Sequence, residues 1–268
     1  AANQANMQAL AERGVRFVEP DSGLLACGDI GPGRLAEGDA IVEAAMGLLF
    51  PKRDYEGLRV MVTAGPTREA IDPVRYISNR SSGKMGYAVA AAAAGRGAKV
   101  TLISGPVHLA PPAGVEVVQV QSTQEMYEAA LDCFERCDVA VKAAAPADFT
   151  PCERVDHKIK KGEGDLVLAL RKTPDILSAL GERKQKQFLC GFAAETNDVE
   201  AYAQGKLERK NLDMIAANDV TRPGAGFDVD TNAVTLFFRE GGKLECEGTK
   251  RQVAETLLDE IRKRLVQE

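Results

Sequence analysis

Tryptophan is absent from the 268-residue sequence, and histidine occurs only twice, as His108 and His157. Both histidines fall in irregular segments without recognisable partners, which argues against a Ser-His-Asp hydrolase and against a histidine-based metal centre. No apolar run approaches the roughly 20 residues that a membrane-spanning helix needs, so we expect no membrane partner. The six cysteines show no CxxC spacing, which favours reduced thiols in a cytoplasmic protein over disulfides.

A strong basic excess is lacking as well. The formal net charge is -5, with 27% charged and 45% hydrophobic residues, which is typical of a globular protein and argues against a nucleic-acid partner. This balance still allows a local basic pocket for a phosphorylated small molecule. The chain begins Ala-Ala-Asn without an initiator methionine or a signal-like apolar segment, so we expect a piece of a longer protein.

Changes in composition and pattern along the sequence predict three parts, which are residues 1–50, a linker over 51–57 and a large domain over 58–268. In the first part we expect a helix closed at Gly14, a strand over Val15–Val18, a glycine-rich loop and a helix capped by Asp39. These elements would bury too little surface to fold alone. Residues 1–50 are therefore predicted to be the end of another domain.

The large domain opens with a strand at Leu58–Val62, a long polar loop and a helix over Tyr87–Ala94. The helix follows Ser81-Ser82-Gly83-Lys84-Met85-Gly86, where unpaired N–H groups and the helix dipole favour a phosphate. Small residues at Gly83 and Gly86 would let a ligand approach the backbone. Neither a Walker loop nor a GxGxxG fingerprint is present, and an ordinary strand-to-helix crossover is the alternative.

Further strands are predicted at 98–104, 115–120 and 138–144, with a helix from Thr123 to about Arg136. This alternation predicts an α/β fold with a doubly wound, Rossmann-like, mostly parallel sheet and helices on both faces. In such sheets ligands bind beyond the carboxyl ends of the strands. We therefore expect the site at 65–68, 104–106 and 143–148.

The second half begins with a basic loop, Lys158-Ile159-Lys160-Lys161, and an alternating segment, Asp165–Arg171, that predicts a strand. Pro174 is predicted at the first position of a helix. The remaining predictions are a strand at 188–194, a helix that places Lys206 and Lys210 on one face, a strand at 213–217, a hairpin over 233–247 and a helix over 250–266.

Each candidate residue also has an ordinary structural explanation. The lysines at 158, 160, 161, 206 and 210 could be solvated surface charges, Asp148 could cap a turn, and Phe192 could be a core residue. Taken from the residues alone, the sequence supports an enzyme for a nucleotide or phosphate ligand that works by positioning and charge neutralisation.

Several long motifs agree with one family in order and separation. They are VTAGPTREAIDPVRYISNRSSGKMG, KAAAPADF, KIKK, GFAAET and KNLDMIAANDV. Residues 57 to 266 thereby resemble the phosphopantothenate–cysteine ligase domain of the bifunctional coenzyme A biosynthesis flavoprotein. The resemblance implies that CTP and Mg²⁺ activate 4'-phosphopantothenate as an acyl-cytidylate with release of pyrophosphate. The amine of L-cysteine then attacks, giving 4'-phosphopantothenoylcysteine and CMP.

The resemblance also implies roles for matching residues. Asn79 and Lys158 are implied to be catalytic, and the metal ligands stay unassigned. The implied substrate-binding residues are Arg75, Asn79, Ser81, Ser82 and Ala145. The implied nucleotide-binding residues are Gly65, Lys142, Ala143, Ala144, Asp148, Lys158, Pro174, Asp175, Ile176, Leu177, Phe192, Lys206 and Lys210. Position 146 is Pro where the family commonly has Val, which we expect to be tolerated. The family further implies a homodimer formed by sheet extension.

Residues 3–37 resemble the end of the partner decarboxylase domain, in which the cysteine of ACGD, here Cys27, takes part in the decarboxylation. The flavin-binding part of that domain does not occur in this sequence. The resemblance therefore implies that FMN and decarboxylase activity belong only to a full-length protein.

Two alternatives remain from the sequence. A short-chain NAD(P) oxidoreductase would use a Tyr-x-x-x-Lys pair, which Tyr202 and Lys206 match in spacing, although the strand before them lacks the expected Ser. A non-catalytic nucleotide-binding regulator would bind nucleotide without releasing pyrophosphate. The motifs favour CTP over ATP but do not decide between them.

Overall fold

The computed structural model describes residues 2–18, 20–24, 30–36, 38–49, 52–161, 165–195, 199–219 and 229–266. It divides the chain into two compact units, 1–52 and 53–268. The structure differs from the expected linker at 51–57 over residues 53–57. Tyr55 is fully buried in the second unit, so that unit already includes residues 53–57.

The first unit contains α1 (Ala2–Glu12), an antiparallel pair of β1 (Asp21–Leu24) with β2 (Ile30–Arg34), and α2 (Gly38–Leu49). The expected strand at Val15–Val18 is not formed, and the hairpin lies where we expected a loop. Apolar content alone does not make a strand, because a strand needs a pairing partner. Asp39 lies inside α2 rather than capping it. Cys27 lies outside the described residues.

An eight-stranded sheet forms the centre of the second unit, in the order β14-β13-β12-β11-β8-β3-β6-β7. Six strands are parallel: β3 (Arg59–Ala64), β6 (Lys99–Ser104), β7 (Val115–Gln119), β8 (Val139–Lys142), β11 (Phe188–Glu195) and β12 (Met214–Asp219). The hairpin of β13 (Thr231–Phe238) and β14 (Lys243–Thr249) continues the sheet in antiparallel fashion. The predicted doubly wound sheet is confirmed.

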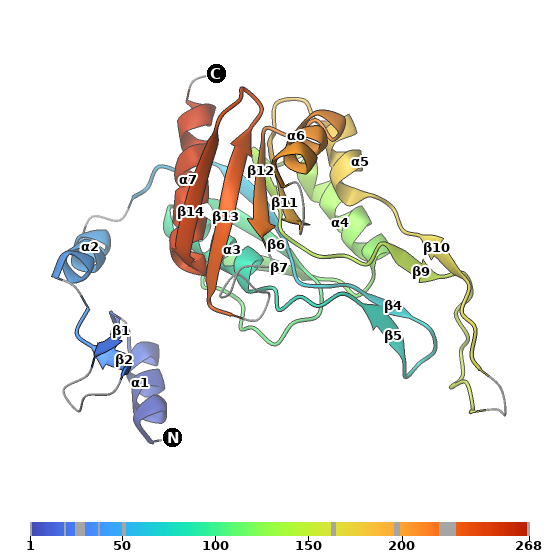
Figure 1. Ribbon diagram of the computed structural model, residues 1–268, viewed down its shortest axis with the longest axis horizontal. Coiled ribbons are helices and arrows are strands. Elements are labelled where there is room, and N and C mark those ends of the chain that lie inside the picture. The colour runs from blue at the N-terminus through green and yellow to red at the C-terminus, as the bar shows by residue number, and fades with distance from the viewer. Residues whose placement is uncertain are drawn as a thin grey trace. The chain divides into compact units, whose positions relative to one another are not determined.

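Helices cover both faces of this sheet (Figure 1). On one face, α3 (Lys84–Gly95) and α7 (Lys250–Leu265) pack on a core that includes Val62, Val141 and Leu257. On the other, α4 (Thr123–Phe134), α5 (Ile176–Arg183) and α6 (Val199–Arg209) pack on a core that includes Met61, Ala140 and Leu180. Because alternate strand residues point to opposite faces, the strands are apolar on both sides.

Two short strand pairs extend from the loops that follow β3 and β8. They are β4 (Arg68–Ala70) with β5 (Tyr76–Ser78), and β9 (Phe149–Pro151) with β10 (Leu170–Lys172). We call residues 68–78, 149–161 and 165–172 the arm, which projects from the sheet in Figure 1. The predicted strand at Asp165–Arg171 is wrong except for its last two residues, because residues 165–169 have no partner strand within the described part of the chain.

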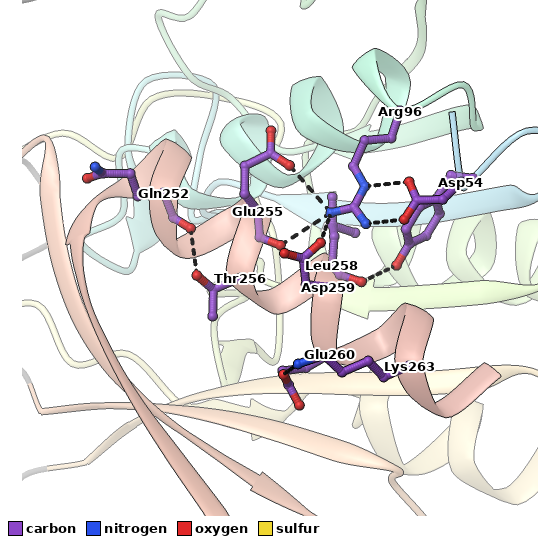
Figure 2. Close-up of polar contacts among 10 residues, drawn as sticks. Asp54, Arg96, Gln252, Glu255, Thr256, Leu258, Asp259, Glu260 and Lys263 are labelled. Atoms are coloured by element: carbon purple, nitrogen blue, oxygen red, sulfur yellow. Dashed lines mark hydrogen bonds and ion pairs between the residues drawn. The ribbon is translucent and has the colours of Figure 1, made fainter. Parts of the chain in front are cut away.

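Arg96, just after α3, fixes the start of the second unit against α7. Its guanidinium donates to Asp54 at 2.9 and 2.5 Å and pairs with Asp259 at 2.7 Å, as Figure 2 shows. The Tyr55 hydroxyl donates to the Leu258 carbonyl at 2.7 Å. The Arg96 side chain is only 4% exposed, so these partners compensate the cost of burying its charge.

Two glycines near the start of α3 contribute to the packing of the fold, and the expected approach of a ligand to this backbone stays a prediction. A Cβ on Gly86 would lie 2.6 Å from Ala64 Cβ, so this glycine lets α3 lie directly against β3. Gly83 has a φ of 76° and lies against Gly65 and Val107. Its positive φ is the conformation that glycine adopts without strain.

We predict that Gly86→Ala lowers the free energy of unfolding by about 1 to 3 kcal/mol, because the added methyl meets backbone and Cβ atoms of β3. Urea unfolding followed by far-UV circular dichroism would measure the change, since the sequence has no tryptophan. Gly95→Ala in the same helix is the matched control, because a methyl group added there would meet no other atom within 4 Å. Equal stability of the two variants would contradict this account of Gly86.

Candidate active site

The carboxyl ends of β3 and β8 meet at the centre of the sheet. From β3 the chain passes through β6 to β7, and then α4 returns it to β8 on the other side of β3. This reversal makes a topological switch point, where doubly wound sheets bind their ligands. The Ala145 N–H donates to the Gly65 carbonyl at 2.9 Å, and Pro66 forms a parallel bridge with Ala145. The predicted strand-end segments 65–68 and 143–148 therefore lie together.

Thr63 holds the first part of the loop after β8. Its carbonyl accepts the Ala143 N–H at 3.2 Å, and its hydroxyl accepts the Ala144 N–H at 3.2 Å. Thr63 is fully buried, so the geometry of this loop is set from inside the sheet.

The Ala147 peptide is held from both sides. Its N–H donates to Thr67 Oγ1 at 3.0 Å, and its carbonyl accepts the hydroxyls of Thr173 at 2.7 Å and Thr123 at 3.2 Å. The buried carboxylate of Glu69 accepts both the N–H and the hydroxyl of Thr123 at 2.9 Å. This network leaves the loop over 143–148 little freedom to move.

Asn79 follows β5 and reaches the same loop. Its Nδ2 donates to the Pro146 carbonyl at 2.9 Å and lies 3.5 Å from the Ala145 carbonyl. The structure thus brings together Asn79 and Ala145, as we expected from the sequence. Ser81 and Ser82 are half-buried just before α3, so this polar stretch leads directly from Asn79 to the helix.

Lys142, the last residue of β8, lies among other charged groups. Its Nζ donates to the Ala144 carbonyl at 2.9 Å, and its charge interacts with Lys206, Lys210, Asp148 and Asp175. Lys206 lies on α6, whereas Lys210 directly follows this helix, which ends one residue earlier than we expected. Burial and then the positive charge of Lys210 lower the pKa of Lys142 to about 8. A polyanion placed here would relieve the repulsion between the lysines.

Asp175 connects the residue after α6 to the start of α5. Its carboxylate accepts Lys210 Nζ at 2.8 Å and the Ser178 N–H at 3.0 Å, which makes it the N-cap of α5. Pro174 therefore precedes the cap and is not the first helical residue, which corrects our prediction. Burial alone would raise the pKa of Asp175, but the hydrogen bonds from Lys210 and Ser178 outweigh it and lower the pKa.

The other expected nucleotide residues differ in exposure. Ile176 and Leu177 are buried on α5, and Leu177 packs beside Gly191 of β11. Phe192 is half-buried on the opposite face of the sheet. Asp148 is exposed, and its carbonyl accepts the Thr173 N–H at 3.0 Å. Ile176 and Leu177 are thus core residues, Phe192 is only partly buried against the core, and Asp148 is accessible.

Arg75 and Lys158 belong to the arm. The Arg75 guanidinium donates to Asp72 at 2.6 and 3.0 Å and to the Ile159 carbonyl at 2.8 Å. Lys158, the residue before Ile159, is exposed. The Arg75 guanidinium holds the pKa of the Asp72 carboxyl well below its usual range.

No dedicated metal centre and no membrane span are evident in the described part of the chain. Among these residues, no group of three or more His, Cys, Asp or Glu side chains could hold a metal ion. None of the helices found there has the length and apolar character required to cross a bilayer.

Residues 55–265 match the family model of the DNA/pantothenate metabolism flavoprotein C-terminal domain. The chain belongs to this family. It is 51% identical over 260 residues to the coenzyme A biosynthesis bifunctional protein CoaBC of Bacillus subtilis, covering 96% of this chain and 64% of the relative. It is 48% identical over 265 residues to CoaBC of Escherichia coli, covering 97% of this chain and 65% of that protein.

Solved structures agree with this placement. The crystal structure of the C-terminal domain of a CoaBC protein superposes with a TM-score of 0.70 at 44% identity, covering 81% of this chain and all of that domain. The chain thus spans less than two thirds of the length of the two CoaBC relatives and includes their C-terminal ligase region.

The sequence did not indicate the side chains whose hydrogen bonds fix the loops of the candidate site, namely Thr63, Thr67, Glu69, Asp72 and Thr123. One of them carried a local signal. Asp72 precedes Pro73, and an Asp-Pro pair favours turn initiation. The contacts of the other four join segments far apart in sequence, so no local pattern indicates them.

We predict that the free energy of unfolding of the wild type, minus that of Lys142→Met, increases with pH. The increase should be roughly 1 kcal/mol per pH unit between pH 8 and 10. The folded-state pKa of Lys142, about 8, lies below the 10.5 that is usual for a lysine. In this window the unfolded chain therefore binds more protons. Urea unfolding at several pH values would measure the difference. Lys99→Met is the control, because Lys99 is an exposed lysine at the amino end of β6, away from the carboxyl ends of the strands. Parallel profiles of wild type and Lys142→Met would contradict the lowered pKa.

Proposed function

We propose that the second unit joins 4'-phosphopantothenate to L-cysteine at the expense of CTP, as a step of coenzyme A biosynthesis in the cytoplasm. The observation that carries this proposal is the hydrogen bond from Asn79 to the loop after β8. This loop begins after Lys142, whose charge interacts with those of Lys206 and Lys210. Family membership and the CoaBC relatives support it.

The first step activates a carboxylate. The carboxylate of 4'-phosphopantothenate attacks the α-phosphorus of CTP, the bond to the β-phosphate oxygen breaks, and pyrophosphate leaves with an acyl-cytidylate remaining. Negative charge builds up on the phosphates during this step, and Lys142, Lys206 and Lys210 are placed to neutralise it. Mg²⁺ would arrive with the triphosphate, because Mg²⁺ is usually held by substrate phosphates and few protein carboxylates.

The second step forms the amide. The amine of cysteine attacks the acyl carbon, CMP leaves with the electron pair of the broken bond, and the amine loses a proton. The Asn79 amide lies against the loop at the switch point, where it can hydrogen-bond the acyl group. Lys158 on the arm is assigned to this second step and to contact with the nucleotide.

A partner domain and FMN are proposed only for the full-length protein. The first unit leaves Leu35, Val42, Leu48 and Leu49 exposed, which supports packing of this segment against another domain. We assign the decarboxylase role of Cys27 to that assembly.

A homodimer is the further partner that we propose. Apolar side chains of the arm are exposed, among them Val167 at 87% and Leu166 at 52%. The alternating sequence of residues 165–169 is typical of a strand, but these residues have no partner strand among the described residues of their own chain. A second copy would supply that partner strand. The two copies would then continue each other's short sheets.

Release of pyrophosphate tests the function. We expect release that requires both 4'-phosphopantothenate and CTP, with ATP weak, and Asn79→Ala should slow product formation about a hundredfold because one fixed amide is lost. Gln185→Ala, an exposed amide before β11 at the opposite edge of the sheet, is the matched control. No release with either nucleotide from folded protein would favour the oxidoreductase or regulator instead. A wild-type rate in Asn79→Ala would refute its role.

The dimer is tested by light scattering. We expect Val167→Glu to shift the protein from dimer to monomer, because a charge would be buried in the interface. Val266→Glu, at another exposed valine after α7, should leave the dimer intact. A monomeric wild type, or a dimeric Val167→Glu, would show that the arm is not the interface.

A further inference from the structure

Asp72 is a buried carboxylate in the turn between β4 and β5. Its side chain has no exposed surface. Oδ1 accepts the backbone N–H groups of Val74 and Arg75, both at 2.8 Å, which closes the turn. These two bonds account for one oxygen of the carboxylate and are local.

The second oxygen joins the turn to a distant segment. Oδ2 accepts Arg75 Nη2 at 2.6 Å, Arg75 Nε at 3.0 Å and the Ile159 N–H at 3.1 Å. Arg75 Nη2 in turn donates to the Ile159 carbonyl at 2.8 Å. The ion pair thus grips both polar backbone groups of Ile159, a residue 87 positions along the chain from Asp72.

This grip acts directly on Lys158. The Ile159 N–H belongs to the same planar peptide unit as the Lys158 Cα, so fixing one fixes the other. A second bond supports the segment, because the Val155 N–H donates to the Ile71 carbonyl at 3.3 Å. The exposed side chain of Lys158 therefore extends from a backbone that hydrogen bonds hold in place.

We propose that Asp72 is a positioning residue for the ligation reaction, acting with Arg75 as a clamp on Ile159 that sets where Lys158 is held. This inference rests on the proposed function. A carboxylate is required because three donors converge on one oxygen, and an ionised acceptor binds them about twice as strongly as a neutral amide. An Asn at this position would turn either its amide nitrogen or its weaker carbonyl toward these donors.

The clamp also changes the role of Arg75. Three donated bonds tie its guanidinium to Asp72 and Ile159. Arg75 was expected to bind substrate, and in this chain it also organises the arm. The side chain is still 41% exposed, so both roles are compatible.

Trypsin tests the clamp without any assumption about activity. Cleavage after Lys158, Lys160 and Lys161, followed by mass spectrometry, reports how often this segment opens. We expect Asp72→Asn to raise the cleavage rate about tenfold, because charge-assisted hydrogen bonds to Ile159 and Arg75 are weakened. Asp138→Asn is the matched control, since Asp138 also accepts a backbone N–H and a side-chain donor of one arginine, Arg59, at the other edge of the sheet.

A double-variant cycle tests the positioning role. We expect Asp72→Asn to slow formation of 4'-phosphopantothenoylcysteine about tenfold in the wild-type background, and less than about threefold in the Lys158→Gln background. The effect should shrink because the clamp acts through Lys158. A merely structural role would slow both backgrounds by the same factor. Circular dichroism would establish that each variant is folded.

Each outcome decides the matter. Faster cleavage, a slower reaction and the loss of that effect in Lys158→Gln would support the inference. Unchanged cleavage would overturn the clamp, and equal slowing in both backgrounds would overturn the positioning role. A wild-type protein that forms no product would refute the proposed function and the positioning role with it, whereas the cleavage result would still decide whether Asp72 holds the arm.

Discussion

The hydrogen bond from the Ala145 N–H to the Gly65 carbonyl, 2.9 Å long, joins the two loops on which the candidate site depends. One loop follows β3 and carries Asn79. The other follows β8 and carries both the run from Ala143 to Asp148 and most of the arm. Because β3 and β8 are parallel neighbours at the switch point, both loops leave the same edge of the sheet. The joint between them thus brings the amide of Asn79 to the loop that begins after Lys142.

Charge is concentrated at this joint in a way that the fold alone does not require. Lys142 is at the end of a central strand, where burial and Lys210 both disfavour its protonated form. Asp175 pairs with Lys210 and so offsets only part of the positive charge. A buried lysine such as Lys142 lowers the stability of the free protein, whereas a bound polyanion would stabilise its charged form. This behaviour is typical of a functional site.

The sequence predicted the sheet well because buried parallel strands are apolar on both faces and alternate with helices. The strands at 59–64, 99–104 and 188–195 lie where their apolar runs indicated. Predictions were wrong where pairing mattered more than composition, as at Val15–Val18 and Asp165–Ala169. For the site, the strand ends were predictable. The contacts of Thr63 and Thr67 with the loop after β8, and the one between Asp72 and Ile159, were not, because they link residues 80 to 87 positions apart.

Those unpredicted contacts also explain how the parts of these loops outside the short strands remain fixed. Buried backbone N–H and C=O groups must find partners, and a loop over a sheet edge has no neighbouring strand to supply them. Thr63 satisfies Ala143 and Ala144, Thr67 satisfies Ala147, and Asp72 with Arg75 satisfies Ile159. The loop residues that these partners hold, Ala143, Ala144, Ala147 and Ile159, either are proposed nucleotide-binding residues or lie next to one. The hydrogen bonds that make these loops stable are therefore the same ones that position the candidate active site.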